Sequence, residues 1–335
     1  MSKSDLKIVI IGCKSTTLFL IQNLHKVFKI DYVITIPETI ASRNEVADYC
    51  DLNPFCKDLN IPVYSAKNYN LKNQDSEDFF KDNKFDVGFV MGWQRLIPSN
   101  ILNYFSIGVF GMHGSSMNLP LGRGRSPMNW AIIEGRRQFY TCLFKYDPGV
   151  DSGDILDVCK FGINEKDTGE TMHYKNSLSM IYLIKKNIDL ICNQKFVLKK
   201  QNEIIEPTYY PKRNPSDSLI DWSQDLIIIE RFIRAVSPPF NGAFTYVNNS
   251  NKLVILNAQI FDFIDFGYDL NIPGEVVQVF PSKKFLINCF GGLLLVNNYD
   301  CDILIKVGDV MKNGDLEIHN FSRNLHGNFD LKENH

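Results

Sequence analysis

Two residues near the middle of the chain have the types and the surroundings of an acid–base pair. His113 stands at the end of an apolar run from Ile107 to Met112, which predicts a buried strand. Asp151 follows a second predicted strand, in the glycine-flanked stretch Gly149-Val150-Asp151-Ser152-Gly153-Asp154. A histidine titrates near neutral pH, and a neighbouring carboxylate favours its charged form. Two strands that deliver these side chains to one edge of a sheet would make a site for proton transfer, so we expect an enzyme.

Strands and helices alternate through the first half of the chain. Apolar runs predict strands over 6–11, 32–36, 62–65, 85–91 and 107–112. Helices are expected between them, over 17–27, over about 43–59 and from Pro98 onward. This alternation is typical of βαβ units, so the predicted fold class is α/β, with a Rossmann-like, mostly parallel sheet covered by helices on both faces. Sites in such sheets lie beyond the carboxyl ends of the strands, where His113 and the corner Met91-Gly92-Trp93 both fall.

The second half of the chain predicts a small all-β domain behind a connecting region. Asp167 with Glu170 forms a capping pair for a helix of about 25 residues. Residues 201–218 are polar and contain prolines, as in a linker, and Ser223 is expected to cap a helix over 224–236. From Ala243 onward, five short strands separated by turn residues predict an OB-like β-barrel. We therefore expect a catalytic domain over 1–205, a linker and connecting helix over 206–242, and the barrel over 243–335.

Composition and charge argue against several classes of protein. No apolar run reaches the roughly 20 residues of a membrane span, and we expect no secretory signal in the polar N-terminal stretch. The eight cysteines lack both Cys-x-x-Cys pairs and zinc-ligand spacing, so we expect no metal site and a cytoplasmic protein. The net charge is −2, and from Glu206 onward 11 Lys and Arg stand against 16 Asp and Glu. This balance argues against a nucleic-acid partner.

The central motif carries a resemblance to a known family. It reads His113-Gly-Ser…Leu119-Pro120…Arg123-Gly124…Pro127…Trp130-Ala131-Ile132…Gly135, followed by Gly149 to Leu156. This order resembles the signature of the N10-formyltetrahydrofolate-dependent formyltransferases. Further along, Leu219 to Ser223 and Ser237 to Ala243 resemble the join to the C-terminal barrel of that family, so the resemblance spans most of the chain. It implies an enzyme that moves the formyl group of N10-formyltetrahydrofolate to a primary amine.

The resemblance also implies roles for individual residues. His113 matches the catalytic histidine and Asp151 the catalytic aspartate. The histidine would pass the proton of the attacking amine toward N10 of the folate while the carboxylate holds the imidazole. The segment from Met91 to Pro98 resembles the part that lines the folate pocket, although a buried strand end is the alternative. The residues expected to contact the folate are Met91, Gly92, Trp93, Leu96 and Gly149.

Four residues are expected to bind the amine substrate. Arg123 and Arg125 suit a diphosphate, since guanidinium forks match phosphate oxygens, but they could equally tie down their loop through backbone carbonyls. Tyr210 and Lys212 could stack on a base and pair with a diphosphate. Solvation of a surface linker is the alternative for these two.

One position departs from the family pattern. The family carries an asparagine two residues before the histidine, whereas this chain has Gly111. A polar donor that stabilises the oxyanion contributes about 3–4 kcal/mol in other acyl-transfer enzymes. The loop after His113 is about two residues longer than usual and contains Asn118. We expect Asn118 or a loop backbone N–H to replace the missing amide; the alternative is that Asn118 is a turn residue before Leu119-Pro120.

Two kinds of amine fit this chemistry. A methionyl-tRNA formyltransferase must hold a tRNA acceptor arm, and the negative charge from Glu206 onward opposes that function. We therefore expect a sugar N-formyltransferase of polysaccharide biosynthesis, which binds the folate donor and a nucleotide-linked amino sugar, with no nucleic-acid or membrane partner. A homodimer is left open. The alternatives are the tRNA enzyme, a non-catalytic folate or nucleotide-sugar binder that lost turnover with the asparagine, and a hydrolase that releases formate.

Overall fold

The computed structural model describes residues 6–322 of the 335-residue chain. Two compact units are present, and each is built from several segments. The first unit takes the chain up to Arg123 together with Tyr140–Phe161 and Lys175–Pro207. The second takes Gly124–Phe139, Gly162–Tyr174 and the chain from Thr208 on. Among the described residues, no helix is both long enough and apolar enough to cross a membrane.

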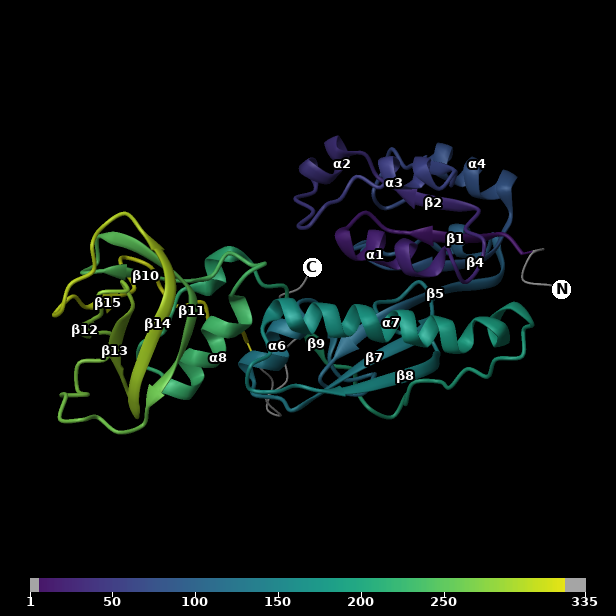
Figure 1. Ribbon diagram of the computed structural model, residues 1–335. Helices are drawn as coiled ribbons and strands as arrows, with labels where there is room; N and C mark the ends of the chain where they lie inside the picture. The colour runs from purple at the N-terminus through teal and green to yellow at the C-terminus, as the bar shows by residue number, and fades with distance from the viewer. Residues whose placement is uncertain (1–5, 323–335) are drawn as a thin grey trace. The chain divides into compact units, whose positions relative to one another are not determined.

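A seven-stranded sheet forms the centre of the first unit (Figure 1). Its strand order is β3-β2-β1-β4-β5-β7-β8. The strands from β1 to β5 pair in parallel and β7 joins β5 in the antiparallel sense, which confirms the mostly parallel sheet predicted from the sequence. The strands are β1 (Ile8–Ile11), β2 (Tyr32–Thr35), β3 (Val63–Ser65), β4 (Phe85–Val90), β5 (Phe105–Ser115), β7 (Gln138–Lys145) and β8 (Ile155–Gly162).

Helices cover both faces of this sheet because its central strands are apolar on both sides. One core contains Leu20 of α1, Cys56 of α3 and Ile184 of α7, packed with strand residues such as Phe89. The other core contains Ala41 of α2, Phe80 of α4 and Ile101 of α5. The helices are α1 (Ser15–Leu24), α2 (Glu38–Arg43), α3 (Asn53–Asp58), α4 (Gln74–Asn83), α5 (Ser99–Leu102) and α7 (Gly169–Cys192). The predicted α/β class is confirmed.

The helix expected over residues 43–59 is wrong. Helix α2 ends at Arg43, a loop follows, and within the expected range only α3 is helical. Glu45 and Asp48 in this loop have φ values of +49° and +60°, outside the helical region. The Cys50 N–H donates to the carbonyl of Cys13 at 3.0 Å, which ties the loop to the end of β1. A long-range hydrogen bond therefore decides a conformation that local periodicity suggested to be helical.

The expected helix caps are also displaced. Thr168, rather than Asp167, caps α7, since Thr168 and Thr171 exchange side-chain-to-backbone hydrogen bonds of 2.9 and 3.3 Å. The Asp167 carboxylate instead accepts the N–H of Asn164 at 2.7 Å. Helix α8 (Leu226–Val236) follows Asp225 as its N-cap. In each case the helix is present where it was predicted, and its first residue lies one or two positions later in the chain.

The second unit combines two helices with an antiparallel barrel. Asn129 of α6 (Pro127–Ile133) donates from its amide to the carbonyl of Ala235 in α8 at 2.8 Å. The barrel strands follow the order β12-β13-β14-β11-β10-β15, and a bridge between Glu275 and Val310 joins the two edges. The sheet thus closes on its own apolar core, which confirms the predicted C-terminal barrel. Its strands are β10 (Ala243–Val247), β11 (Asn251–Asp262), β12 (Val276–Val279), β13 (Phe285–Cys289), β14 (Gly292–Cys301) and β15 (Met311–Lys312).

The segment expected to be a plain linker contains short regular elements. These are β9 (Tyr209–Tyr210), which pairs with β6 (Arg123–Gly124), and the 3-10 turn η1 (Pro215–Ser218). In the second unit, the Arg125 N–H donates to the carbonyl of Tyr210 at 2.8 Å. Backbone pairing therefore orders part of the stretch that was expected to be a linker.

Candidate functional site

Strand β5 brings His113 to the carboxyl edge of the sheet. Val90, the last residue of β4, pairs with Gly111, so β5 runs on beyond its parallel neighbour. On its other side β5 pairs with β7, where Gly111 lies opposite Phe144 and His113 opposite Cys142. Side chains alternate along a strand, so Gly111 and His113 face the same side of the sheet.

Both ring nitrogens of His113 have a partner. Nδ1 lies 3.3 Å from Oδ2 of Asp151, and Nε2 lies 2.7 Å from the carbonyl oxygen of Gly122. A carbonyl can only accept, so Nε2 carries a proton and donates it in a hydrogen bond to Gly122. A second proton on Nδ1 would then face the carboxylate directly. The geometry therefore suits a pair that holds and moves a proton between imidazole and carboxylate.

The two members of the pair differ in their access to solvent. The His113 side chain is 6% exposed and that of Asp151 is 21% exposed. Asp151 is therefore the member that an entering ligand meets first. His113 lies behind it, held by Gly122.

The Gln201 side chain fixes the loop that contains Asp151. Asp151 has a φ of +48°, in the left-handed region that few residues other than glycine adopt. The Gln201 amide donates to the carbonyls of Asp151 and Gly153 at 2.8 and 2.9 Å. Its Oε1 accepts from Nη2 of Arg123 at 2.7 Å. Sequence reasoning missed Gln201, because it begins a polar stretch and lies 50 residues from Asp151.

Asp147 closes the same loop from its other end. Its Oδ1 accepts the N–H of Gly149 at 3.0 Å and the hydroxyl of Ser152 at 2.6 Å. Gly149, expected to contact the folate, is exposed in this turn. The loop that presents Asp151 is thus tied at both ends by side chains.

Tyr146 is a second residue of the site that sequence reasoning missed. Its N–H donates to the carbonyl of Val109 at 2.8 Å, which extends the β5–β7 ladder by one residue. Its ring stacks on Phe144, with centroids 5.1 Å apart and planes at 18°. Burial, together with the negative charge of Asp151, raises the pKa of Tyr146, so the phenol stays protonated at neutral pH. No local signal marks it, since an aromatic residue after a strand is typical of a core.

Asn118 lies at the surface. Its carbonyl accepts the N–H of Leu121 at 3.0 Å in a turn, and the residue is exposed. Within residues 6–322 its side chain has no hydrogen bond. The structure thus shows Asn118 as a turn residue, and its role as an oxyanion donor stays a prediction.

The segment after β4 lies at the same sheet edge as His113. Met91 is 2% exposed, and its carbonyl accepts the Thr17 hydroxyl at 2.6 Å. Gly92 has a φ of +76° and approaches Thr17 so closely that a Cβ there would lie 2.6 Å from its hydroxyl. Trp93 is 8% exposed, and within the described part of the chain its buried Nε1 has no hydrogen-bond partner. Leu96 is half exposed. A buried donor left unpaired costs about 1–3 kcal/mol, so Trp93 is suited to an acceptor on a ligand.

The residues expected to bind the amine substrate divide into buried and accessible ones. Arg123, in the first unit, is 8% exposed and bonded to Gln201. Tyr210, in the second unit, is 1% exposed and donates its hydroxyl to Glu134 at 2.9 Å. Arg125 is partly exposed and Lys212 is exposed, both in the second unit. Their substrate contacts stay predictions, with the accessible pair better suited to a ligand.

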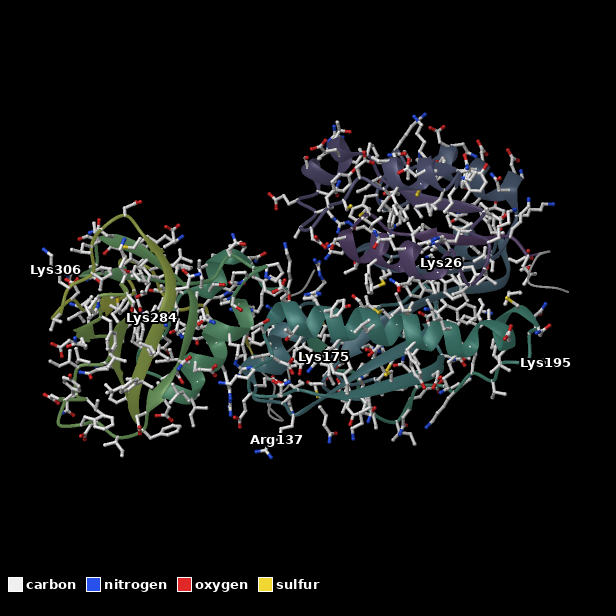
Figure 2. All side chains as sticks on the ribbon, viewed as in Figure 1. Lys26, Arg137, Lys175, Lys195, Lys284 and Lys306 are labelled. Carbon is white, nitrogen blue, oxygen red and sulfur yellow. The ribbon has the colours of Figure 1, made fainter. Side chains whose placement is uncertain are left out.

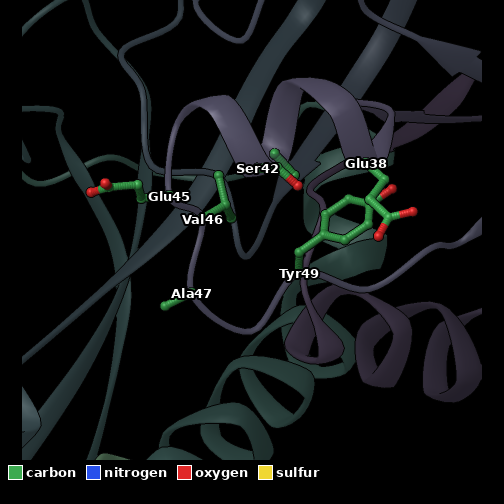
Figure 3. Close-up of a pocket in the computed structure, with 7 residues that line it drawn as sticks. Glu38, Ser42, Glu45, Val46, Ala47 and Tyr49 are labelled. Carbon is green, nitrogen blue, oxygen red and sulfur yellow. The ribbon is translucent and has the colours of Figure 1, made fainter.

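A separate hollow of about 410 Å³ lies on α2 and the loop after it (Figure 3). Its lining consists of Glu38, Ala41, Ser42, Glu45, Val46, Ala47 and Tyr49. The two carboxylates make it negative, which does not suit the phosphates or carboxylates of the expected ligands. Across residues 6–322, His, Cys, Asp and Glu side chains form no group of three placed to hold a metal ion. The candidate site is therefore the sheet edge at His113.

Comparison with known proteins assigns both parts of the chain to one family. The formyl transferase family matches residues 7–178, and its C-terminal domain family matches residues 212–302. A curated relative, the bifunctional polymyxin resistance protein ArnA of Wigglesworthia glossinidia brevipalpis, is 33% identical over 253 residues. That alignment covers 73% of this chain and 36% of the relative, so the chain spans about a third of the relative's length.

Solved structures share the fold. The N-formyltransferase of Helicobacter canadensis, solved with folinic acid and dTDP-3-aminofucose, gives a TM-score of 0.63 at 20% identity over 88% of this chain and 100% of that one. The methionyl-tRNA formyltransferase of Clostridium thermocellum gives 0.51 at 22% identity over 78% and 95%. Likeness at these identities concerns the fold alone. Because the family match over residues 7–178 covers just over half of the sequence, the chain belongs to the formyl transferase family.

Proposed function

We propose that the protein transfers a formyl group from N10-formyltetrahydrofolate to the primary amine of a sugar carried on a nucleoside diphosphate. The observation that carries this proposal is the His113–Asp151 pair, with 3.3 Å between Nδ1 and Oδ2, in a chain of the formyl transferase family. The Helicobacter canadensis structure, with its folinic acid and dTDP-3-aminofucose, supports both ligand classes.

The reaction requires the transfer of one proton from the amine to N10 of the folate. The amine nitrogen attacks the formyl carbon, the bond from that carbon to N10 breaks, and the proton released by the amine moves to N10. We assign this transfer to the His113–Asp151 pair, where the more exposed carboxylate meets the ammonium and the imidazole behind it shares the proton. The Gly122 carbonyl keeps the ring oriented meanwhile.

The remaining expected residues take roles that fit their burial. We assign the folate to the edge formed by the Met91 and Gly92 backbone and the unpaired indole N–H of Trp93. Arg125 and Lys212, as accessible cations, are the members of the acceptor set able to pair with a diphosphate. The cytoplasm remains our proposed location, since all eight cysteines are free, as in a reducing compartment. Residues 1–205 would then carry catalysis and 243–335 the barrel.

The fold likeness to a methionyl-tRNA formyltransferase supports a second candidate acceptor, a tRNA. The chain from Glu206 on, with 11 basic against 16 acidic residues, lacks the positive field that a phosphate backbone needs. Figure 2 shows Lys284 and Lys306, the lysines labelled on the barrel, at separate places on it. The negative charge of the chain from Glu206 on therefore favours an amino sugar over a tRNA as the formyl acceptor.

The test is an acceptor panel with the formyl donor, in which release of tetrahydrofolate is measured. The panel contains dTDP- and UDP-linked 3- and 4-amino sugars and initiator methionyl-tRNA. We expect turnover with at least one amino sugar and none with the tRNA. Turnover with tRNA alone would overturn the sugar assignment, and formate release without any amine would indicate a hydrolase.

Variants of the pair test the mechanism on the same panel. His113→Gln and Asp151→Asn should each lower kcat by at least about 100-fold, the usual scale of general acid–base catalysis. Two matched controls are His25→Gln and Asp154→Asn. His25 is the C-cap of α1, with its Nδ1 3.0 Å from the carbonyl oxygen of Ile21, and Asp154 lies in the same loop as Asp151. A loss below tenfold in both pair variants would remove the proposed mechanism.

A further inference from the structure

The space beside His113 that a side chain at position 111 would occupy is filled by a phenol. A Cβ built on Gly111 would lie 2.6 Å from Cζ of Tyr146 and 2.7 Å from its hydroxyl oxygen. The polar end of a short amide side chain lies about 2.4 Å from its own Cβ, by ordinary bond lengths. The Tyr146 hydroxyl therefore occupies the region that an amide donor on residue 111 would reach.

Strand register places this hydroxyl on the face that carries His113. The Tyr146 N–H bonds to the carbonyl of Val109, which makes these two residues opposite each other in the antiparallel ladder. Val109, Gly111 and His113 alternate onto one face, and Tyr146 shares it. Phe144, opposite Gly111, stacks on the ring and holds it across the glycine.

The hydroxyl is also chemically available. Within residues 6–322 it forms no hydrogen bond, although the raised pKa keeps its proton in place. The residue as a whole is partly exposed, so a ligand can approach it. A protonated, unpaired donor on the sheet face that carries His113 is placed to stabilise charge that develops on a substrate oxygen.

We propose that the Tyr146 hydroxyl donates a hydrogen bond to the oxyanion that forms on the formyl oxygen during transfer. This role rests on the proposed function. When the amine lone pair bonds to the formyl carbon, the carbonyl π pair moves onto oxygen, and Tyr146 stabilises that charge without losing its proton. As the bond to N10 breaks, the pair returns to re-form the carbonyl, and N10 takes the proton from the His113–Asp151 pair.

Tyr146→Phe tests the role, because it keeps the stacked ring and removes only the O–H. We expect kcat to fall by about 100-fold or more, the scale on which single oxyanion donors act, with the KM of the amine within about threefold of wild type and the KM of the formyl donor raised by at most about tenfold. The shape of the pH–rate profile should not change, since a donor that keeps its proton adds no titration. Tyr64→Phe is the matched control, as Tyr64 also stacks on a phenylalanine, Phe79, in the same unit.

A rescue variant separates donation from structural support. Tyr146→Ala empties the space, and Gly111→Asn in that background puts an amide donor there. We expect the double variant to recover at least tenfold in kcat over Tyr146→Ala, whereas Gly111→Asn alone should lower activity, since Tyr146 already fills the space. Asn118→Ala should stay within about threefold of wild type. A 100-fold loss in Asn118→Ala with full activity in Tyr146→Phe would assign the donor to the turn and overturn our proposal.

A binding measurement tests the donor without turnover. We would titrate 10-formyl-5,8-dideazafolate and its deformylated parent into wild type and Tyr146→Phe. Wild type should prefer the formylated ligand, and the variant should lose that preference by about fivefold to tenfold, the scale of one neutral hydrogen bond. If Tyr146→Phe keeps the wild-type preference for the formylated ligand while wild type turns over normally, the role of Tyr146 is overturned and the proposed function stands. If wild type neither binds these ligands nor turns over, the proposed function fails and takes this role with it.

Discussion

Replacing Gln201 with methionine should detach the Asp151 loop from its support. The Gln201 side chain is 8% exposed and makes three hydrogen bonds, two to the carbonyls of Asp151 and Gly153 and one from the Arg123 guanidinium. Methionine keeps the length of the side chain and forms none of them. Neutral hydrogen bonds contribute about 0.5–1.5 kcal/mol and those to a charged group about 1.5–3 kcal/mol. We therefore expect the free energy of unfolding to fall by about 3–5 kcal/mol.

The same substitution should also reduce catalysis. Without the bond to its carbonyl, Asp151 can leave its left-handed conformation, and the carboxylate moves away from Nδ1 of His113. A displacement of about 1 Å can cost about 100-fold in rate, so we expect kcat to fall by about 10-fold to 100-fold under conditions where the variant is folded.

A matched variant separates stability from positioning. Asn187 is 5% exposed and donates to the carbonyl of Leu183 at 2.9 Å and to Asp157 at 2.7 Å, and it belongs to the same unit. Asn187→Leu should lose a similar free energy, measured by urea unfolding, but keep the wild-type kcat. If Gln201→Met keeps full kcat, or loses less than about 1 kcal/mol, Gln201 does not hold Asp151 in place.

Three further outcomes follow from burial and charge. Burial raises the pKa of the Cys142 thiol to about 12. Iodoacetamide at pH 8 should therefore modify Cys142 far more slowly than the partly exposed Cys159, which mass spectrometry can map. Comparable rates at the two cysteines would contradict the burial of Cys142. Although burial opposes it, hydrogen bonding, chiefly from Lys186, holds the pKa of Asp157 below its usual range. Asp157→Asn should thus be less stable than wild type at pH 7, and the difference should shrink as the pH falls below about 4 in a series of urea unfolding curves. Tyr210→Phe loses a hydrogen bond of 2.9 Å and should cost about 1 kcal/mol with no change in the KM of the amine substrate, whereas a tenfold rise in that KM would show a substrate contact.

Apolar periodicity predicted most of the regular structure because burial of a strand or helix is a local pattern. The runs that end near Ile11, Met91 and Met112 became the buried strands β1, β4 and β5. The same reasoning failed over 43–59, where a backbone bond from Cys50 to Cys13 bends the chain. No local pattern contains a partner almost forty residues away.

Residue type alone did not predict the surroundings of three expected site residues, because long-range contacts decide burial. Arg123 and Tyr210 have side chains suited to a nucleotide, yet both are buried and bonded within the protein. Asn118 has the amide of an oxyanion donor but lies exposed in a turn. Burial depends on the assembled sheet and loops, which the type of a residue does not report.

By itself, the sequence determined the α/β class, the barrel after it, and the delivery of His113 and Asp151 to one sheet edge, because strand ends and glycine-rich turns are properties of short segments. Only the tertiary structure decided what supports that pair. The register of β5 against β7 places the Tyr146 ring against Gly111. A hydrogen bond between residues 50 positions apart in the sequence joins Gln201 to the backbone of Asp151. These partners depend on which strands pair and in which register, and that information exists only when the whole sheet has formed.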